Sequence, residues 1–351
     1  VSQNLMSENK LLFKNTINEE YERMREDYGN EKTKNLISLS EARENKFDFN
    51  WKEYTPIKPS FEGIKFFAEI SVKDLVDYID WTPFFNAWGF KSSYPKILKD
   101  QKMKNEANKL FEDANNLLNK IIQENWFNPK GTIGFFKANS SGDDIIINEK
   151  HTLHHLRQQV SKGNKPNYCL SDFIAPISSG KEDWIGAFAV TAGSNVEKIG
   201  KKLANKNNDY ESIMVKVIGD RIAEALAEKM HEKVRKNFWG YAKNESLENK
   251  QLIKEQYQGI RPAPGYPACP DHSEKLMIWK LLDIKNNAKL KLTESFAVNP
   301  ASSVTGWYFS HPDSKYFSIS KISNEQLKDY SKRKRVNSKK LEKIFPHILE
   351  I

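Results

Sequence analysis

The stretch with the most chemical information is the ten-residue loop Arg261–Pro270, RPAPGYPACP. Its four prolines fix the backbone φ angle repeatedly and remove backbone donors, so the loop should be stiff without being a helix or a strand. Arg261 could hold a carboxylate through two parallel N–H contacts, Gly265 permits close approach of another group, and Tyr266 offers a ring with a hydroxyl. A ligand-binding loop and a plain surface turn both fit these residues, and residue chemistry alone leaves the two readings open.

Acidic side chains form a second group of candidates. Asp220 and Glu224 lie four residues apart on a helix expected over 210–236, so they share one face. Either a cation of the same helix balances them or a cationic ligand binds there. Asp80 stands within the aromatic and apolar run YIDW (78–81), so its carboxylate should have a partner.

Metal and nucleotide motifs are not found. His151 and His155 are four residues apart, but no acidic or cysteine ligand accompanies them at metal-site spacing, so no metal site is predicted. Cys269 and His272 are two ligands short of a zinc site, and Pro270 between them does not indicate an oriented Cys-His pair. The sequence contains neither a phosphate-binding loop nor the G-x-G-x-x-G fingerprint, which argues against the Rossmann-like methyltransferases.

Composition indicates a folded chain with a basic surface. Of its 351 residues, 38% are hydrophobic and 12% aromatic, and the net charge is +9. The run Lys332–Arg335 either contacts phosphates or lies at a solvated corner between helices, and because few aromatics accompany it we do not expect a nucleic-acid partner. The longest apolar stretch, Trp184–Gly193, is too short to span a bilayer, so no membrane association is predicted. Two cysteines suit a reducing, cytoplasmic location.

Periodicity gives the elements that must position these residues. Helices are expected at 71–80, 105–124, 151–161, 210–236, 246–257, 324–333 and 338–345. Strands are expected at 132–136 and 144–148, forming a hairpin, at 184–191, and consecutively at 290–298, 303–309 and 315–320, the last two pairing with each other. Hairpin strands with long helices between them indicate an α+β fold, and a single domain should follow a polar helical arm over residues 1 to about 30.

The proline-rich loop also carries a family resemblance. The string GIRPAPGYPACPDHSEK (Gly259–Lys275) resembles the R-x-x-x-G-Y loop in the activation domain of cobalamin-dependent methionine synthase. Further similar stretches are YIDWTPFF (78–85), YPKIL (94–98), HHLRQQ (154–159), IGAFAVT (185–191), IMVKVIGDRIAEALAE (213–228) and LTESFAVNPASSVTGWYFSHPDSKYF (292–317). The resemblance implies a single C-shaped α+β domain over 40–351, built on a bent antiparallel sheet flanked by helices. Residues 1–39 would be the linker and helical arm from a preceding cobalamin domain.

The resemblance implies a role in reactivation. The domain would bind S-adenosylmethionine and present its methyl group for reductive methylation of inactive cob(II)alamin, which restores methylcobalamin for methyl transfer from methyltetrahydrofolate to homocysteine. Its partners would be the cobalamin domain of the same polypeptide and flavodoxin or an equivalent reductase, although a separate corrinoid subunit is an alternative. The chain lacks the D-x-H-x-x-G motif, the cysteine cluster for zinc and homocysteine, and the folate barrel. We therefore expect part of a methyltransferase that performs no complete reaction alone, with cobalamin and zinc held by absent domains.

The resemblance also assigns ligand contacts. Arg261 would meet the carboxylate or nearby polar atoms of the ligand, and Asp80 its cationic amino end. Glu224 and Glu255 would border the same groove.

Four further positions complete these expectations. Tyr316 and Phe317 match an aromatic pair beside the ligand, and Phe317 stands where the family carries tyrosine. Tyr266 would face the corrin when the domains close, and Asp220 would meet the histidine released from cobalt. These last two are expected at the interface with the cobalamin domain.

Overall fold

A six-stranded antiparallel sheet is built around one long strand, β2, in the computed structural model, which describes residues 36–349. The strand order is β4-β3-β2-β5-β8, and β1 pairs with β2 beside β3. One edge of β2 is thus shared by two strands, β1 along its first half and β3 along its second. The strands are β1 (Gly63–Phe67), β2 (Lys130–Ser141), β3 (Asp144–Ile147), β4 (His151–His154), β5 (Trp184–Thr191) and β8 (Ser303–Tyr308), with β6 (Lys291–Leu292) and β7 (Val298–Asn299) as a separate pair.

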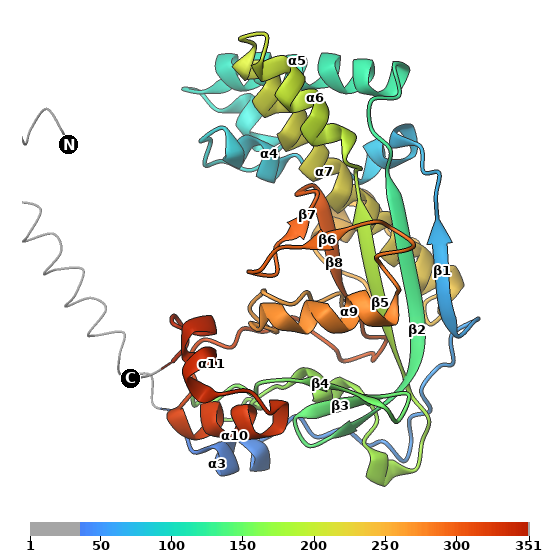
Figure 1. Ribbon diagram of the computed structural model, residues 1–351, viewed down its shortest axis with the longest axis vertical. Coiled ribbons are helices and arrows are strands. Elements are labelled where there is room, and N and C mark those ends of the chain that lie inside the picture. The colour runs from blue at the N-terminus through green and yellow to red at the C-terminus, as the bar shows by residue number, and fades with distance from the viewer. Residues whose placement is uncertain (1–35, 350–351) are drawn as a thin grey trace, which may run out of the picture.

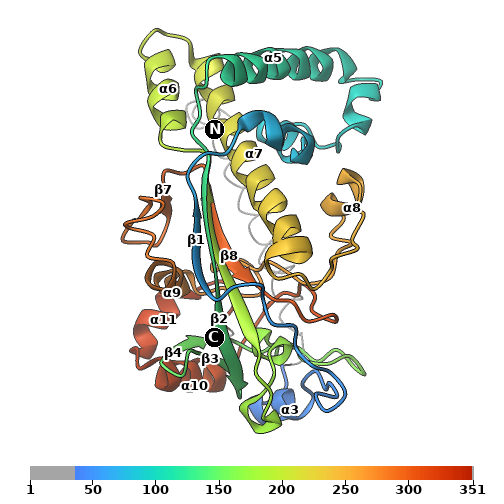
Figure 2. The same ribbon diagram turned by 90° about the vertical axis from the view of Figure 1, so that its right-hand side faces the viewer.

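Helices cover both faces of this sheet because its strands alternate between two cores. On β5, Phe188 and Val190 pack into the core that contains α7, whereas Ala187 and Ala189 pack into the core that contains α9. Figure 2 shows α7 and α9 on opposite sides of the strands. The helices are α3 (Leu39–Glu44), α4 (Thr82–Ala87), α5 (Lys104–Gln123), α6 (Asn195–Ala204), α7 (Asp209–Lys233), α8 (Asn249–Ile253), α9 (Lys275–Leu281), α10 (Asn324–Lys334) and α11 (Ser338–Ile344).

The two ends of the molecule project to the same side of the sheet. Helices α4 to α7 gather at one end, and α3, α10 and α11 gather at the other (Figure 1). The long, curved strand β2 runs between these ends, so the outline is that of a C. The predicted α+β class and the bent antiparallel sheet flanked by helices are confirmed.

Local patterns predicted several elements correctly. The helix expected at 105–124 is α5, the strand at 184–191 is β5, and the hairpin is β2 with β3. The helix expected over 210–236 is α7, which continues into a π-helical turn at Val234–Phe238. The expected helix at 71–80 is a 3₁₀ helix at Val72–Tyr78. The helical arm expected over residues 1 to about 30 lies outside the described residues.

The helix predicted at 151–161 is wrong. Asn148 and Glu149 both adopt positive φ, 49° and 56°, and the Lys150 N–H bonds to the Ile147 carbonyl at 3.0 Å. Two consecutive left-handed residues form a tight hairpin turn, so the chain after them returns as strand β4 alongside β3.

Three other expected elements are divided, shorter or lacking. The strand predicted at 290–298 is divided into β6 and β7, which pair with each other. The helix predicted at 246–257 covers only Asn249–Ile253, because Glu255 turns left-handed (φ 54°) and the Gln256 N–H closes the end on the Gln251 carbonyl. No strand forms over 315–320. The edge of β8 that such a strand would use is occupied by the start of the proline-rich loop, where Ile260 and Phe309 exchange both backbone hydrogen bonds at 3.1 and 3.0 Å.

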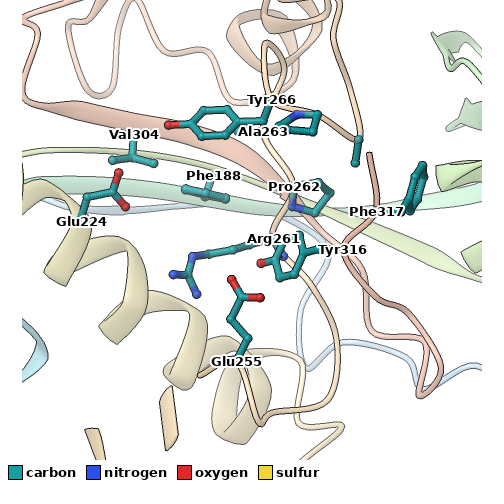
Figure 3. A pocket seen from close by; sticks show the side chains of 12 residues that line it. Phe188, Glu224, Glu255, Arg261, Pro262, Ala263, Tyr266, Val304, Tyr316 and Phe317 are labelled. Carbon is teal, nitrogen blue, oxygen red and sulfur yellow. The ribbon is translucent and has the colours of Figure 1, made fainter. Parts of the chain in front are cut away.

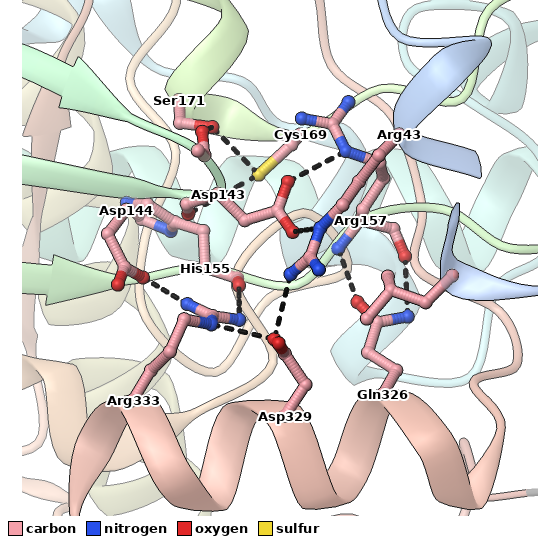
Figure 4. Close-up of polar contacts among 12 residues, drawn as sticks. Arg43, Asp143, Asp144, His155, Arg157, Cys169, Ser171, Gln326, Asp329 and Arg333 are labelled. Carbon is pink, nitrogen blue, oxygen red and sulfur yellow. Dashed lines mark hydrogen bonds and ion pairs between the residues drawn. The ribbon is translucent and has the colours of Figure 1, made fainter. Parts of the chain in front are cut away.

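A buried ionic network ties the first described helix to the last part of the chain (Figure 4). Arg157 is 1% exposed and bonds to Asp143 at 2.8 Å and to both oxygens of Asp172 at 2.8 and 2.7 Å. Arg43 of α3 bonds to the second oxygen of Asp143 at 2.8 Å and to Asp329 of α10 at 2.9 Å. The network therefore joins α3, the β2–β3 hairpin and α10.

Removing the central arginine should be far more costly than removing the outer one. Arg157→Met leaves the buried Asp172 without its cation and Asp143 with Arg43 alone, so we expect a loss of about 3–5 kcal/mol in the free energy of unfolding. The Arg43 side chain is 40% exposed, so Arg43→Met should lower the free energy of unfolding by about 1 kcal/mol or less. Urea denaturation at pH 7 measures both, and equal losses would contradict this assignment of the network.

Acid should weaken the same network. Burial alone would raise the pKa of Asp143, but Arg157 and Arg43 outweigh it and hold that pKa below its ordinary value. A lowered folded pKa means that this carboxylate stabilises the fold at pH values above the unfolded pKa of about 4, and the contribution is lost as the pH falls through the folded pKa.

Candidate functional site

A pocket of about 270 Å³ lies between the proline-rich loop and α7. Six of the eight residues predicted for the site and its interface line it: Glu224, Glu255, Arg261, Tyr266, Tyr316 and Phe317. Phe188 of β5 and Val304 of β8 also belong to the lining, so the sheet supplies one wall. In Figure 3, Arg261, Tyr316 and Glu255 lie on one side of the pocket and Tyr266 on the other.

The start of the proline-rich loop is fixed by the edge of β8. After the Ile260–Phe309 pair, the Pro262 carbonyl accepts a bond from the Trp307 N–H at 2.9 Å. This close approach requires Gly306, because a Cβ atom there would lie 2.7 Å from the Pro262 carbonyl oxygen. Arg261 therefore extends from backbone that behaves as an added strand of the sheet.

The far end of the loop closes in a tight turn that presents Tyr266. The Gly265 N–H bonds to the Cys269 carbonyl at 2.7 Å, and the Cys269 N–H bonds to the Tyr266 carbonyl at 2.9 Å. Gly265 has a φ of 97°, and a Cβ atom there would lie 2.2 Å from the His272 ring. The predicted close approach at Gly265 is confirmed. Tyr266 is 59% exposed as a result, at the rim of the pocket.

The Arg261 side chain reaches back to α7. Its Nη2 forms an ion pair with Glu228 Oε2 at 2.7 Å, and its Nη1 donates to Tyr257 Oη at 2.9 Å and lies 3.2 Å from His231 Nδ1. The Arg261 backbone N–H donates to Tyr316 Oη at 3.0 Å. Burial opposes the charged guanidinium, but Glu228 more than offsets it, so the pKa of Arg261 stays above its ordinary value.

Glu228 is a site residue that sequence reasoning missed. It continues the row of acids Asp220, Glu224 and Glu228, each one helical turn after the last on α7. This spacing was a usable signal. The spacing does not predict Arg261 as the partner of Glu228, because the two residues are 33 positions apart and meet only in the folded chain.

Asp80 and Asp220 do not line the pocket. Asp80 is half-buried at the start of α4, where its Oδ1 accepts the Thr82 N–H at 2.9 Å, which supplies the partner that its apolar setting requires. Asp220 is exposed on α7 and accepts from the Ser302 hydroxyl at 2.7 Å.

Aromatic rings hold the segment that follows β8. The Phe317 ring stacks on Tyr168, with centroids 5.8 Å apart, and lies 6.4 Å from Phe173. Neighbouring Tyr316 is 37% exposed and turns its hydroxyl to the Arg261 backbone. The expected aromatic pair therefore lies at the pocket, with one ring held by packing and the other by a hydrogen bond.

Other features considered in the sequence have structural explanations. Within residues 36–349, no group of three or more His, Cys, Asp or Glu side chains is arranged to hold a metal ion. In the basic run, Arg333 pairs with Asp329 and Lys334 with Asp271, so two of its four cations point inward rather than lying at a solvated corner. The helices of the described part of the chain include none with the length and apolar character needed to cross a bilayer.

A side chain at Gly306 should displace the loop. Gly306→Ala places a methyl group against the Pro262 carbonyl and the Phe188 ring, so we expect a loss of about 1–3 kcal/mol in the free energy of unfolding. Gly131→Ala on β2 is the matched control, because its Cβ would meet only side chains, at 3.4 Å or more. Thermal unfolding followed by circular dichroism compares the two, and equal stability would contradict the close loop–sheet contact.

Comparisons with known proteins agree on one family. The family model described as "Vitamin B12 dependent methionine synthase, activation domain" matches residues 71–335. A crystal structure of the MetH reactivation domain bound to AdoHcy is 49% identical, with a TM-score of 0.87 over 90% of this chain and 99% of that one. The match spans the proline-rich loop, α7 and β8. The chain therefore belongs to the family of activation domains of vitamin B12-dependent methionine synthase, a methyltransferase.

Proposed function

We propose that this chain binds S-adenosylmethionine in the pocket between the proline-rich loop and α7 and presents its methyl group to the cobalamin of a preceding domain. The observation that carries the proposal is the placement of one anchored cation, Arg261, in a pocket with two carboxylates, Glu224 and Glu255. The related reactivation domain was crystallised with AdoHcy, the demethylated form of this ligand.

The charges of the pocket complement those of the ligand. S-adenosylmethionine carries a carboxylate, an ammonium and a sulfonium, and Arg261 would bind the first of these through charge-assisted hydrogen bonds. Glu224 and Glu255 favour the two cationic groups, since opposite charges a few ångströms apart attract strongly where water is partly excluded. Tyr316 and Phe317 would lie beside the ligand.

Asp80 remains a proposed contact for the amino group. Because it does not line the pocket, the bound ligand would have to extend beyond that lining toward the start of α4. The bond that Asp80 accepts from the Thr82 N–H uses one carboxylate oxygen and leaves the other for an ammonium.

The reaction would require partners outside this chain. An electron from flavodoxin or an equivalent reductase, together with the sulfonium methyl group, would convert cob(II)alamin to methylcobalamin and leave S-adenosylhomocysteine. We propose that Tyr266 and Asp220, both exposed, meet the cobalamin domain, and that the enzyme acts in the cytoplasm. Zinc and the folate would belong to other domains.

The proposed division at residues 39 and 40 separates the linker from the activation domain. Ser38 caps α3, and the Ile37 N–H already bonds to the Gln159 carbonyl at 3.0 Å. The last few linker residues would therefore lie against the domain.

Removing the Arg261 side chain should weaken binding. Arg261→Ala should lose about 2 kcal/mol or more of binding free energy for S-adenosylmethionine, because a charge-assisted contact would be left unpaired. Calorimetric titration measures this loss, and Lys332→Ala, which removes an exposed cation of α10, is the control for net charge. Unchanged affinity in Arg261→Ala would remove Arg261 from the site.

Tyr266 should separate ligand binding from reactivation. Tyr266→Ala should leave the affinity of this chain for S-adenosylmethionine within about twofold, because the ring is mostly exposed at the rim. In the full-length enzyme it should slow the recovery of methylcobalamin, because fewer molecules reach the closed arrangement.

The two measurements are calorimetry on this chain and the absorbance change during recovery in the whole enzyme. Weakened ligand binding with a normal recovery rate at saturating ligand would instead make Tyr266 a ligand contact and overturn the interface assignment.

A further inference from the structure

The hydrogen-bond donors of Arg261 are only partly used by the protein. A guanidinium has five N–H donors. Nη1 directs its two at Tyr257 Oη and His231 Nδ1, at 2.9 and 3.2 Å, and Nη2 directs one at Glu228 Oε2, at 2.7 Å. Within residues 36–349, the Nε–H and the second Nη2–H have no further partner. Two donors therefore remain, one on each of two nitrogens bonded to the same carbon.

The groups that hold Arg261 are rigid. Glu228 and His231 lie on consecutive turns of α7 and are 8% and 0% exposed. The His231 ring stacks on Tyr308 at 5.2 Å with an angle of 14°, and Tyr257 stands edge-on to His231 at 4.8 Å. A side chain that three packed groups contact has little rotamer freedom left to lose when a ligand binds.

His231 must act as a neutral acceptor. An arginine only donates, so a hydrogen bond at Nδ1 needs an unprotonated Nδ1 and assigns the ring proton to Nε2, which has no hydrogen-bond partner within residues 36–349. Burial, then Arg235 and Arg261, lower the pKa of His231 well below its ordinary value, which keeps the ring neutral.

A second ion pair leaves Glu228 available to Arg261. Arg235, fully buried nearby, lies 3.7 Å from Glu228 Oε1 and would compete for it. Glu245 instead binds Arg235 through both carboxylate oxygens, at 2.8 and 2.7 Å. The two arginines and two glutamates balance in charge, and the shorter contact of Glu228 is the one to Arg261.

We propose that Glu228, supported by His231 and Tyr257, is a positioning residue that holds Arg261 with two free N–H donors, and that these donors bind the carboxylate of the ligand. The inference rests on the proposed function and extends it, because it makes Glu228, a residue outside the pocket lining, responsible for part of the affinity for the ligand's carboxylate. Glu228 is not among the residues that line the pocket.

The test compares two ligands in matched variants of the 351-residue chain. Glu228→Gln keeps the shape and removes the charge, and Glu232→Gln makes the same change one turn further along α7, where the carboxylate bonds to Tyr78 and Lys236. Calorimetry is run with S-adenosylmethionine and with its analogue in which hydrogen replaces the carboxylate. We expect Glu228→Gln to lower the affinity for S-adenosylmethionine at least about fivefold and the affinity for the analogue less than about twofold. Glu232→Gln should leave both affinities within about twofold.

A double variant tests whether Glu228 acts through Arg261. If it does, Glu228→Gln should cause no further loss of affinity when added to Arg261→Ala. Equal weakening of both ligands, or unchanged binding of both, in a folded Glu228→Gln protein would overturn the inference.

A milder variant covers the case in which Glu228→Gln does not fold. Tyr257→Phe removes one contact at Nη1 without unpairing a charge. It should lower the affinity for S-adenosylmethionine about two- to threefold and leave the affinity for the analogue unchanged. Absence of that selective loss would also overturn the inference. Failure of the unaltered chain to bind S-adenosylmethionine at all would instead overturn the proposed function, and the inference with it.

Discussion

The ion pair between Arg261 and Glu228, 2.7 Å long, joins the proline-rich loop to the longest helix of the described chain. The loop approaches α7 because its first residues pair with the edge of β8. Helix α7 covers one face of the sheet, where β5 and β8 direct alternate side chains into the core that contains α7. If Arg261 lost this contact, its cation would be left partly buried without a carboxylate, a costly arrangement. The pocket therefore depends on a charge pair between segments distant in sequence.

The arrangement separates a preformed interior from an exposed rim. Glu228, His231 and Tyr308 are buried and held by packing, whereas Tyr266 and Asp220 are exposed. A site built in this way can bind its ligand without rearrangement while its outer residues remain free for a partner domain.

Local patterns predicted the elements whose formation depends on local interactions. The apolar period of α5 and the uninterrupted apolar run of β5 are examples, since in each the apolar positions are the ones that become buried. The strand expected at 315–320 failed because its pairing edge is taken by Ile260, a competition that no local pattern reveals. The site behaves in the same way. Its prolines mark the loop of Arg261 and Tyr266 as a candidate, whereas the pairing of Glu228 with Arg261 exists only in the folded chain.

The central claim is that S-adenosylmethionine binds between the proline-rich loop and α7 with its carboxylate on Arg261. A crystal structure of this chain grown with S-adenosylmethionine tests it most directly. The account predicts the ligand in this pocket, with its carboxylate within hydrogen-bond distance of Arg261 Nε and Nη2 and its sulfonium nearer to Glu224 or Glu255 than to any cation. A ligand bound elsewhere on the molecule, or bound here with its carboxylate turned away from Arg261, would contradict it.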